Sequence, residues 1–202
     1  MSRIIRLPDH LVNQIAAGEV VERPASVLKE LLENAADAGA GRVTADLKDA
    51  GRRLIRVVDD GVGMTPEEME LALQRHATSK IASEADLQAI RSLGFRGEAL
   101  PAICAVSRFS LMSRARGAER GALLRGEGGE IQQRGAVECS EGTMVEIADL
   151  FFNTPARLKF LKSPQAELGA ALRVATQLAL AQPALHLRVT HNDRVVLTAP
   201  KA

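Results

Sequence analysis

Apolar residues follow helical spacing in some stretches of the chain and alternate in others, which predicts a mixture of helices and strands. The clearest helical stretch runs from Ala25 to Ala38, and Pro24 suits its first turn as Gly39 suits its end. Its apolar residues recur every three or four positions: Val27, Leu28, Leu31, Leu32 and Ala35. A shorter helical stretch precedes it and is predicted to end at Gly18.

Further helices are predicted downstream from capping signals and apolar spacing. Thr65 and Glu68 have the spacing of a capping box before an apolar run. A helix is expected at residues 98–106, and Thr154-Pro155 is predicted to cap a short basic one. An Ala/Leu-rich helix is expected at residues 167–181.

Strands are predicted where apolar residues alternate between turn signals. Residues 43–47 and 54–58 read as two strands joined by a turn near Asp49-Ala50-Gly51. The other expected strands are 109–113, 121–125, 130–134, 143–147, 185–190 and 194–198. Because helices and antiparallel strands both recur, the pattern predicts an α+β sandwich with helices on one face of a sheet.

Composition narrows the classes of function. Lys and Arg number 26 against 25 Asp and Glu, so a contact with nucleic acid would need a local basic patch. Five Phe with no Trp or Tyr argue against a base-stacking RNA-binding sheet or single-strand-binding barrel. Cys104 and Cys139 lie far apart, which is typical of a reducing compartment. No apolar run reaches about 18 residues, so we expect a soluble, cytoplasmic protein.

One stripe of the helix after Pro24 carries polar residues that suit a metal or a reactive water. At about 100° per residue, four of them share the stripe opposite the apolar one: Glu30, Glu33, Asn34 and Asp37. Three carboxylates this close repel each other unless solvent or a cation relieves them. A solvated helix face is one interpretation. The other is a Mg²⁺ and catalytic face, where Asn34 binds the metal and Glu30 polarises a water.

An apolar strand runs directly into two acids and two glycines, Val57-Val58-Asp59-Asp60-Gly61-Val62-Gly63-Met64. An acidic hairpin is the plainer interpretation of this stretch. The Asp-x-Gly-x-Gly spacing also suits a site where a planar ring packs close to the backbone and a carboxylate accepts from an exocyclic amine, as in adenine recognition. The sequence contains neither a Walker A loop nor a dinucleotide fingerprint.

Two loops and the start of one strand complete the candidate segments. Arg75-His76-Ala77-Thr78-Ser79-Lys80-Ile81 and Gly94-Phe95-Arg96-Gly97-Glu98-Ala99-Leu100 carry hydroxyls, cations and glycines, and the second leads into a helix. Amides at a helix start, preceded by flexible glycines, suit a phosphate cradle and a movable lid. Polar loops with a glycine cap are the alternative. Glu141-Gly142-Thr143 opens a strand where glycine leaves room for a ligand.

Together these segments resemble the GHKL ATPases, which include gyrase B, the large heat-shock chaperones, histidine kinases and MutL. The motifs follow in the order Glu-x-x-x-Asn, Asp-x-Gly-x-Gly, Gly-Phe-Arg-Gly-Glu-Ala-Leu and Gly-Thr. Three further stretches are similar to the MutL DNA mismatch repair family nearly residue for residue: Asn13 to Pro24, Arg75 to Ile81 and Asn153 to Arg157. The resemblance runs from about Ile4 to Thr198.

The resemblance implies the GHKL (Bergerat) two-layer sandwich, with a mixed, mostly antiparallel sheet, and it implies roles for single residues. Glu30 would be the general base that activates water against the γ-phosphate of ATP, and Asn34 would bind Mg²⁺. Asp59 would accept from the adenine amino group, Gly63 would let the ring approach, and Thr143 would support this network. The other residues implied to contact ATP are Asp37, Met64, Thr78, Ser79, Lys80, Gly94, Phe95, Arg96, Gly97, Glu98, Ala99 and Leu100.

The resemblance also implies how such a domain works in a larger protein. Residues 1–202 would be an N-terminal ATP-binding domain, with an N-terminal arm at 1–20 and an ATP lid at 75–97. We expect the protein to continue into a second ATPase-region domain, which sends a Lys to the γ-phosphate, and into a C-terminal dimerisation domain. ATP would order the lid and drive homodimer formation. Hydrolysis would be slow, and impaired in this chain alone.

Expected partners are a MutS-like mismatch-recognition protein and downstream nuclease or helicase factors, without a membrane. DNA binding would be weak, through phosphates and without sequence preference. Its candidate residues, for which a solvated basic surface is the alternative, are Arg157, Lys159, Lys162, Arg114, Arg116 and Arg120. Two other functions stay open: a non-hydrolysing nucleotide-dependent dimerisation or recruitment module, and another GHKL ATPase such as a topoisomerase or chaperone.

The chain departs from the family pattern at a few positions. Asp60 stands where Asn is common, which adds a negative charge beside the expected adenine pocket. Ala35 replaces a frequent Ser, and Phe152 stands where Tyr is usual. None of these departures removes a catalytic group.

Overall fold

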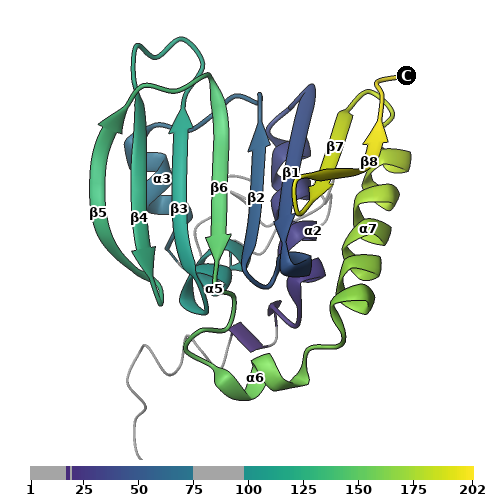
Figure 1. Ribbon diagram of the computed structural model, residues 1–202. Coiled ribbons are helices and arrows are strands. Elements are labelled where there is room, and N and C mark those ends of the chain that lie inside the picture. Colours follow the sequence, from purple (N-terminus) through teal and green to yellow (C-terminus); the bar gives the residue numbers. More distant parts are fainter. Residues whose placement is uncertain (1–16, 19, 75–97) are drawn as a thin grey trace, which may run out of the picture.

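The computed structural model describes residues 17–18, 20–74 and 98–202. These residues form an eight-stranded sheet in the order β5-β4-β3-β6-β2-β1-β7-β8 (Figure 1). β1 (Arg42–Lys48) pairs parallel with β7 (His186–His191), and every other neighbouring pair in the sheet is antiparallel. The predicted α+β class and the mixed, mostly antiparallel sheet are therefore confirmed.

The elements lie close to their predicted positions. The other strands are β2 (Leu54–Asp59), β3 (Arg108–Arg114), β4 (Gly121–Glu127), β5 (Glu130–Val137), β6 (Gly142–Ala148) and β8 (Arg194–Ala199). The helices are α2 (Pro24–Asp37), α3 (Pro66–Ala72), α5 (Ala99–Ala105), α6 (Pro155–Phe160) and α7 (Pro164–Ala181), with a 3-10 turn η1 (Asp49–Gly51). Within these described ranges, no helix combines the length and hydrophobicity that crossing a membrane requires.

The helices pack on one face of the sheet. In Figure 1, α2, α3 and α5 lie behind the strands, and α7 packs against α2 at the β7–β8 end. Alternate residues of β1, namely Val43, Ala45 and Leu47, are buried on this face. The predicted apolar stripe of α2 meets them in the main core, and all its members are buried: Val27, Leu28, Leu31, Leu32 and Ala35. Removing this surface from water is the main force that joins the two layers.

Local signals set the helix ends as the sequence predicts. Pro24 occupies the first turn of α2, and Gly39 follows the helix with a φ of 71°, which favours glycine. The capping box of α3 is present: the Thr65 N–H donates to Glu68 Oε2 at 2.8 Å, and the Glu68 N–H donates to Thr65 Oγ1 at 3.3 Å. Ser163 starts α7 earlier than predicted, since its Oγ accepts from the Ala166 N–H at 3.3 Å.

Two local predictions are wrong. Thr154 precedes α6, but its backbone φ and ψ of −132° and 68° do not aim the side chain at the helix start, and it makes no capping hydrogen bond. Gly18 does not end the first helical stretch, because Val20 is still helical. A Cβ at Gly18 would lie 1.7 Å from Arg157 Nη2. The glycine therefore allows the Arg157 side chain to pack against this helical stretch and does not end it. The predicted helical residues before Ala17 lie outside the described ones.

Candidate functional site

Two motifs that the sequence predicts separately meet at one corner on the helical side of the sheet. β2 ends at Asp59, and the turn that follows it contacts the C-terminal end of α2: the Val62 N–H donates to the Ala38 carbonyl at 3.1 Å. The Asp-x-Gly-x-Gly turn therefore adjoins the helix that carries the polar stripe. A carboxylate at the end of a central strand and the oxygen-bearing helix face belong to the same region of the fold.

Asp59 is a half-buried hydrogen-bond acceptor. Its Oδ1 accepts from the Gly61 N–H at 2.9 Å, and its backbone pairs with Thr143 of β6. Burial raises the pKa of Asp59, backbone N–H groups of Gly61 and Thr143 oppose that rise, and the neighbouring Asp60 charge adds to it. A carboxylate in such a place is suited to accepting from a bound donor rather than to a structural ion pair.

Ser113 joins this corner, and sequence reasoning missed it. Its Oγ accepts from the Met64 N–H at 2.9 Å, donates to the Gly142 carbonyl at 2.9 Å and lies 3.0 Å from Thr143 Oγ1. Ser113 is 1% exposed and faces the helices from β3. A polar residue at a strand position that alternation assigns to the core is the signal that could have identified Ser113.

The glycines of the corner are needed for backbone packing. Gly63 has a φ of 67°, and a Cβ there would lie 2.0 Å from the Arg114 carbonyl oxygen. Gly142 has a φ of 110°, and its Cβ would lie 2.1 Å from the Asp59 carbonyl oxygen. Side chains are excluded at both positions by neighbouring strands, whether or not a ligand is bound. The contact of Gly63 with an adenine ring stays a prediction.

The side chain of Asp60, which follows β2, is hydrogen-bonded to the backbone at the start of β1. Its Oδ1 accepts from the N–H groups of Gly41 and Arg42, each at 2.8 Å. These two amides stabilise the negative charge of Asp60. The side chain thus has a local structural role, although its charge also acts on Asp59.

The polar stripe of α2 is not uniformly solvated. Glu33 is 8% exposed, and its carboxylate pairs with Lys29 Nζ at 2.8 Å, one turn before it. Lys29 is therefore a cation that relieves the repulsion expected on this stripe. Glu30 and Asn34 are half-buried, and Asp37 is exposed.

The donors on α2 fit a Mg²⁺ ion that arrives with a nucleotide. Among residues 17–18, 20–74 and 98–202, no three His, Cys, Asp or Glu side chains gather into a metal site. Mg²⁺ commonly takes one or two protein oxygens and completes its shell with phosphate oxygens and water. The half-buried amide of Asn34 is compatible with that kind of coordination.

The start of α5 contains the last described part of the predicted phosphate-binding segment. Glu98 precedes the helix, and its carbonyl accepts from the Ala102 N–H at 3.0 Å. Ala99 begins the helix, and Leu100 packs against the main core, so the side chain of Leu100 has a structural contact. The remaining residues of the two loops lie outside the described ones: Thr78, Ser79, Lys80, Gly94, Phe95, Arg96 and Gly97.

Glu167 anchors the beginning of α2, and it too was missed. It is 1% exposed, and its two oxygens accept from Arg23 Nε and from the Lys162 N–H, each at 2.9 Å. Arg23 directly precedes Pro24, so a residue of α7 fixes the start of the helix that carries Glu30. An acid among the apolar positions of α7 is the sequence signal for such an anchor.

Arg157 of α6 differs from two nearby lysines, Lys159 on the same helix and Lys162 just after it. It is half-buried, its Nη1 donates to the Val21 carbonyl at 3.4 Å, and its guanidinium lies 5.7 Å from the Phe151 ring centroid. Lys159 and Lys162 are exposed. Arg157 therefore contributes to packing, and a contact of the two lysines with DNA stays a prediction.

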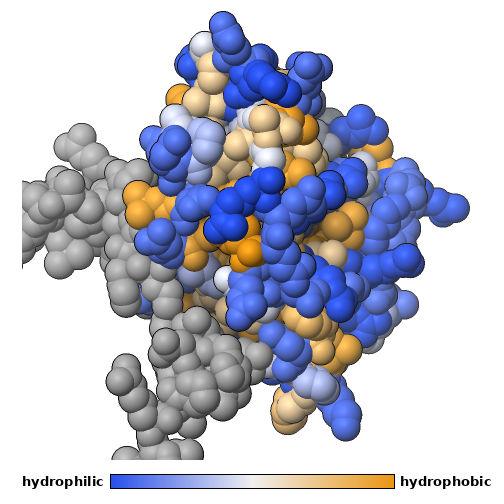
Figure 2. Space-filling model, turned by 90° about the vertical axis from the view of Figure 1, so that its left-hand side faces the viewer, coloured by the Kyte–Doolittle hydropathy of each residue, from blue (hydrophilic) through white to orange (hydrophobic). Residues whose placement is uncertain are grey.

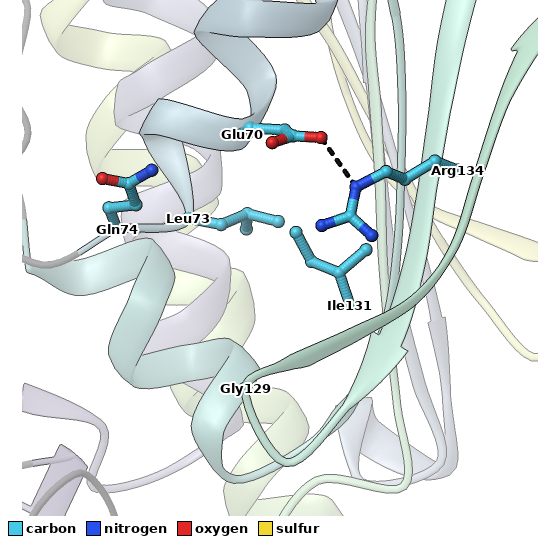
Figure 3. Close-up of a pocket in the computed structure, with 6 residues that line it drawn as sticks. All are labelled: Glu70, Leu73, Gln74, Gly129, Ile131 and Arg134. Carbon is cyan, nitrogen blue, oxygen red and sulfur yellow. Dashed lines mark hydrogen bonds and ion pairs between the residues drawn. The ribbon is translucent and has the colours of Figure 1, made fainter. Parts of the chain in front are cut away.

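A surface hollow of about 260 Å³ lies between α3 and the β4–β5 hairpin (Figure 3). An ion pair between Glu70 and Arg134, 2.7 Å long, crosses it. The residues that line it are Glu70, Leu73, Gln74, Gly129, Ile131 and Arg134. Figure 2 shows this side of the molecule, where hydrophilic residues dominate and hydrophobic ones lie between them. None of the predicted site residues in the described part of the chain lines the hollow, so we do not assign the site to it.

Comparison with known proteins agrees with the geometry of the corner. Residues 22–143 match the family model described as Histidine kinase-, DNA gyrase B-, and HSP90-like ATPase. This match covers more than half of the chain and includes both the polar stripe of α2 and the Asp59–Gly63 turn. The chain therefore belongs to this ATPase family.

Within that family the chain is similar to MutL DNA mismatch repair proteins, which confirms the resemblance found in the sequence. MutL of Xanthomonas campestris pv. campestris is 56% identical over 191 residues, 95% of this chain and 31% of the relative. MutL of Geobacter sulfurreducens is 51% identical over 197 residues, 98% of this chain and 32% of the relative. This chain thus spans about a third of the relatives it matches.

Solved structures agree with this similarity. The Aquifex aeolicus MutL ATPase domain complexed with ADP matches with a TM-score of 0.74 at 34% identity, covering 91% of this chain and 65% of that one. The N-terminal domain of a DNA repair protein matches with a TM-score of 0.79 at 28% identity, covering 96% of this chain and 58% of that one. The fold predicted from the resemblance is therefore confirmed.

Proposed function

We propose that the chain is the ATP-binding and ATP-hydrolysing domain of a MutL-type DNA mismatch repair protein. The observation that carries this proposal is the corner where the Asp59–Gly63 turn meets the end of α2, within the matched family region. A half-buried carboxylate and an oxygen-bearing helix face are the two groups needed to bind an adenine base and a metal-bound polyphosphate. The ADP complex of the similar Aquifex aeolicus domain supports a nucleotide as the ligand.

The residue roles follow from chemistry and from the resemblance. Asp59 accepts from the adenine amino group, and Thr143 supports it from the neighbouring strand. Glu30 orients the attacking water and takes its proton on a carboxylate oxygen. Asn34 is the protein ligand for Mg²⁺, which, when bound, neutralises phosphate charge. The remaining contacts with ATP are proposed for Asp37, Gly63, Met64, Glu98, Ala99 and Leu100.

The larger cycle is also a proposal, supported by the similarity to MutL. We propose an ATP lid at 75–97, an arm at 1–20 that crosses to a second subunit, and a homodimer formed on ATP binding. The chain spans 31% of its Xanthomonas campestris relative, and this supports further domains in the whole protein. We also propose that the protein acts with a MutS-like partner and with nuclease or helicase factors in the cytoplasm. Turnover is slow because it waits for the conformational step. Weak DNA contact, through phosphates, should fall steeply with salt.

Replacing Glu30 tests the proposed reaction. Glu30→Ala should keep ATP affinity and lose phosphate release by about a hundredfold or more, as expected when a general base is removed. Glu67→Ala, which removes an exposed carboxylate from α3, is the matched control and should leave both quantities unchanged. Both are measured by nucleotide titration and by phosphate release, in this chain and in a form that continues past Ala202.

The outcomes separate the candidate functions. Hydrolysis in the wild type that Glu30→Ala abolishes supports the ATPase. ATP binding without hydrolysis in either form supports the non-hydrolysing recruitment module instead. Unchanged hydrolysis in Glu30→Ala shows that Glu30 is not the base.

A further inference from the structure

The three hydrogen bonds of Ser113 fix which of its neighbours donate. A serine hydroxyl has one hydrogen and two acceptor lone pairs. The Met64 N–H, at 2.9 Å from Ser113 Oγ, can only donate, and so it occupies one lone pair. The Gly142 carbonyl, also at 2.9 Å, can only accept, and so it takes the single hydrogen of Ser113.

The third partner of Ser113 must then be a donor. Thr143 Oγ1 lies 3.0 Å from Ser113 Oγ, and only one lone pair of Ser113 is left to it. Thr143 therefore gives its own hydroxyl hydrogen to Ser113. Ser113 is buried, so solvent does not compete for these contacts. The oxygen of Thr143 is left with lone pairs alone for any further partner.

The same row of the sheet contains Asp59. Ser113 pairs with Thr143 across β3 and β6, and Thr143 pairs with Asp59 across β6 and β2. A carboxylate is also an acceptor. We propose that Ser113 determines base specificity. Because Ser113 accepts the hydroxyl hydrogen of Thr143, the side chains of Thr143 and Asp59 present only acceptor oxygens to a base. Such a site selects a purine with a 6-amino group over one with a 6-oxo group. This inference rests on the proposed function and deepens it.

The discrimination comes from opposite hydrogen-bond polarity at one position of the base. The 6-amino group of adenine offers two N–H donors, which the acceptors at Asp59 and Thr143 can take. A 6-oxo group is itself an acceptor, so the same corner would leave it and the protein oxygens unpaired and partly desolvated. A Thr143 hydroxyl that is free to rotate would donate to the oxo group and remove part of this penalty.

Affinities for ATP and inosine triphosphate test the inference. Inosine triphosphate has a 6-oxo group and lacks the 2-amino group of GTP, so it isolates the position in question. By calorimetry with Mg²⁺, the wild-type chain should prefer ATP, and Ser113→Ala should reduce that preference by about tenfold. Ser110→Ala is the matched control, because Ser110 lies on the same strand with its side chain on the opposite face and should leave the preference unchanged.

Variants of Thr143 show whether Ser113 acts through it. Thr143→Val should also reduce the preference for ATP, and Ser113→Ala should cause no further change in the double variant. Thr143→Ser, which restores a hydroxyl, should recover the preference. Where Ser113→Ala does not fold, Thr143→Val and Thr143→Ser still decide whether the preference depends on the hydroxyl that Ser113 contacts.

The two levels of the proposal fail in different ways. A wild-type chain that binds neither nucleotide overturns the proposed function. A chain that binds ATP, but whose ATP preference is unchanged in Ser113→Ala or Thr143→Val, overturns only the role of Ser113. A purely structural role of Ser113 would lower the melting temperature and both affinities by the same factor, which also counts against the inference.

Discussion

The two halves of the candidate site are held in different ways. The corner around Asp59 is set by the register of three neighbouring strands, in which Ser113, Thr143 and Asp59 occupy one row. The helix face that carries Glu30 is set by core packing of α2 and, at its start, by the ion pair of Arg23 with Glu167, 144 residues away. The proposed base-binding corner is thus held by the sheet, whereas the helix face with the proposed general base is held by core packing and by one buried anchor at its start. The two should be separable by mutation.

The largest expected effect is loss of base recognition. Asp59→Ala removes the acceptor at the end of β2 and should weaken ATP binding by about a hundredfold or more. The reason is that the 6-amino group of adenine loses the carboxylate that accepts its hydrogen bond. Fluorescence titration with a labelled ATP measures it. Asp60→Asn is the control, since it removes a neighbouring charge and keeps the Oδ1 acceptor for Gly41 and Arg42. Equal losses in both variants would show that charge, not the Asp59 contact, governs binding.

The buried anchor of α2 should have the next largest effect, and on stability. Glu167→Ala leaves Arg23 and the Lys162 N–H without their partner, so the free energy of unfolding should fall by about 3 kcal/mol. Urea unfolding measures this. Glu146→Ala breaks the more exposed pair with Arg56 and should cost about 1 kcal/mol or less. If the two variants lose the same stability, Glu167 is not an anchor.

A pair of glycines sharpens the comparison further. Gly63 and Gly39 both have positive φ, of 67° and 71°. A Cβ at Gly63 would meet Arg114 O at 2.0 Å, whereas a Cβ at Gly39 would meet nothing within 4 Å. Gly39→Ala should cost about 1 kcal/mol from backbone strain alone, and Gly63→Ala should cost about 2 kcal/mol or more since strands must also move. Thermal unfolding of the two variants would contradict this if their losses were equal.

The smallest expected effect is a pH dependence from Asp59. Burial raises its pKa above 3.8, so the folded chain keeps the proton to higher pH than the unfolded chain. That contribution stabilises the fold in acid and is lost as pH rises through the folded pKa. Asp59→Asn lacks this titrating group. The melting temperature of the variant, relative to that of the wild type, should therefore rise from acid to neutral pH. If the melting temperatures of the two proteins change in parallel with pH, titration of Asp59 does not contribute to stability.

Local signals in the sequence predicted most of the fold. The apolar stripe of α2, the capping box at Thr65 and Gly39 just beyond the helix act within a few residues, so they can be recognised without tertiary context. Thr154 was assigned a capping role from residue type alone, and that prediction failed because its backbone conformation leaves the side chain without a capping hydrogen bond.

The missed features depend on distant partners. Ser113 and Glu167 are polar residues at core positions, and nothing near them in the chain reveals what they bond. Gly63 and Gly142 were interpreted as room for a ligand, yet the atoms that exclude a side chain belong to other strands. Such contacts exist only once strand register is fixed. The sequence therefore located the corner but not the contacts that shape it.

Calorimetric titration with a non-hydrolysable ATP analogue and Mg²⁺ tests the central claim most directly. The claim is that the Asp59 corner and the polar face of α2 together bind an adenine nucleotide. We predict saturable binding of one nucleotide per chain by the wild type and no detectable binding by Asp59→Ala at the same concentrations. No heat from the wild type at millimolar nucleotide, or equal binding by the two proteins, would contradict the claim.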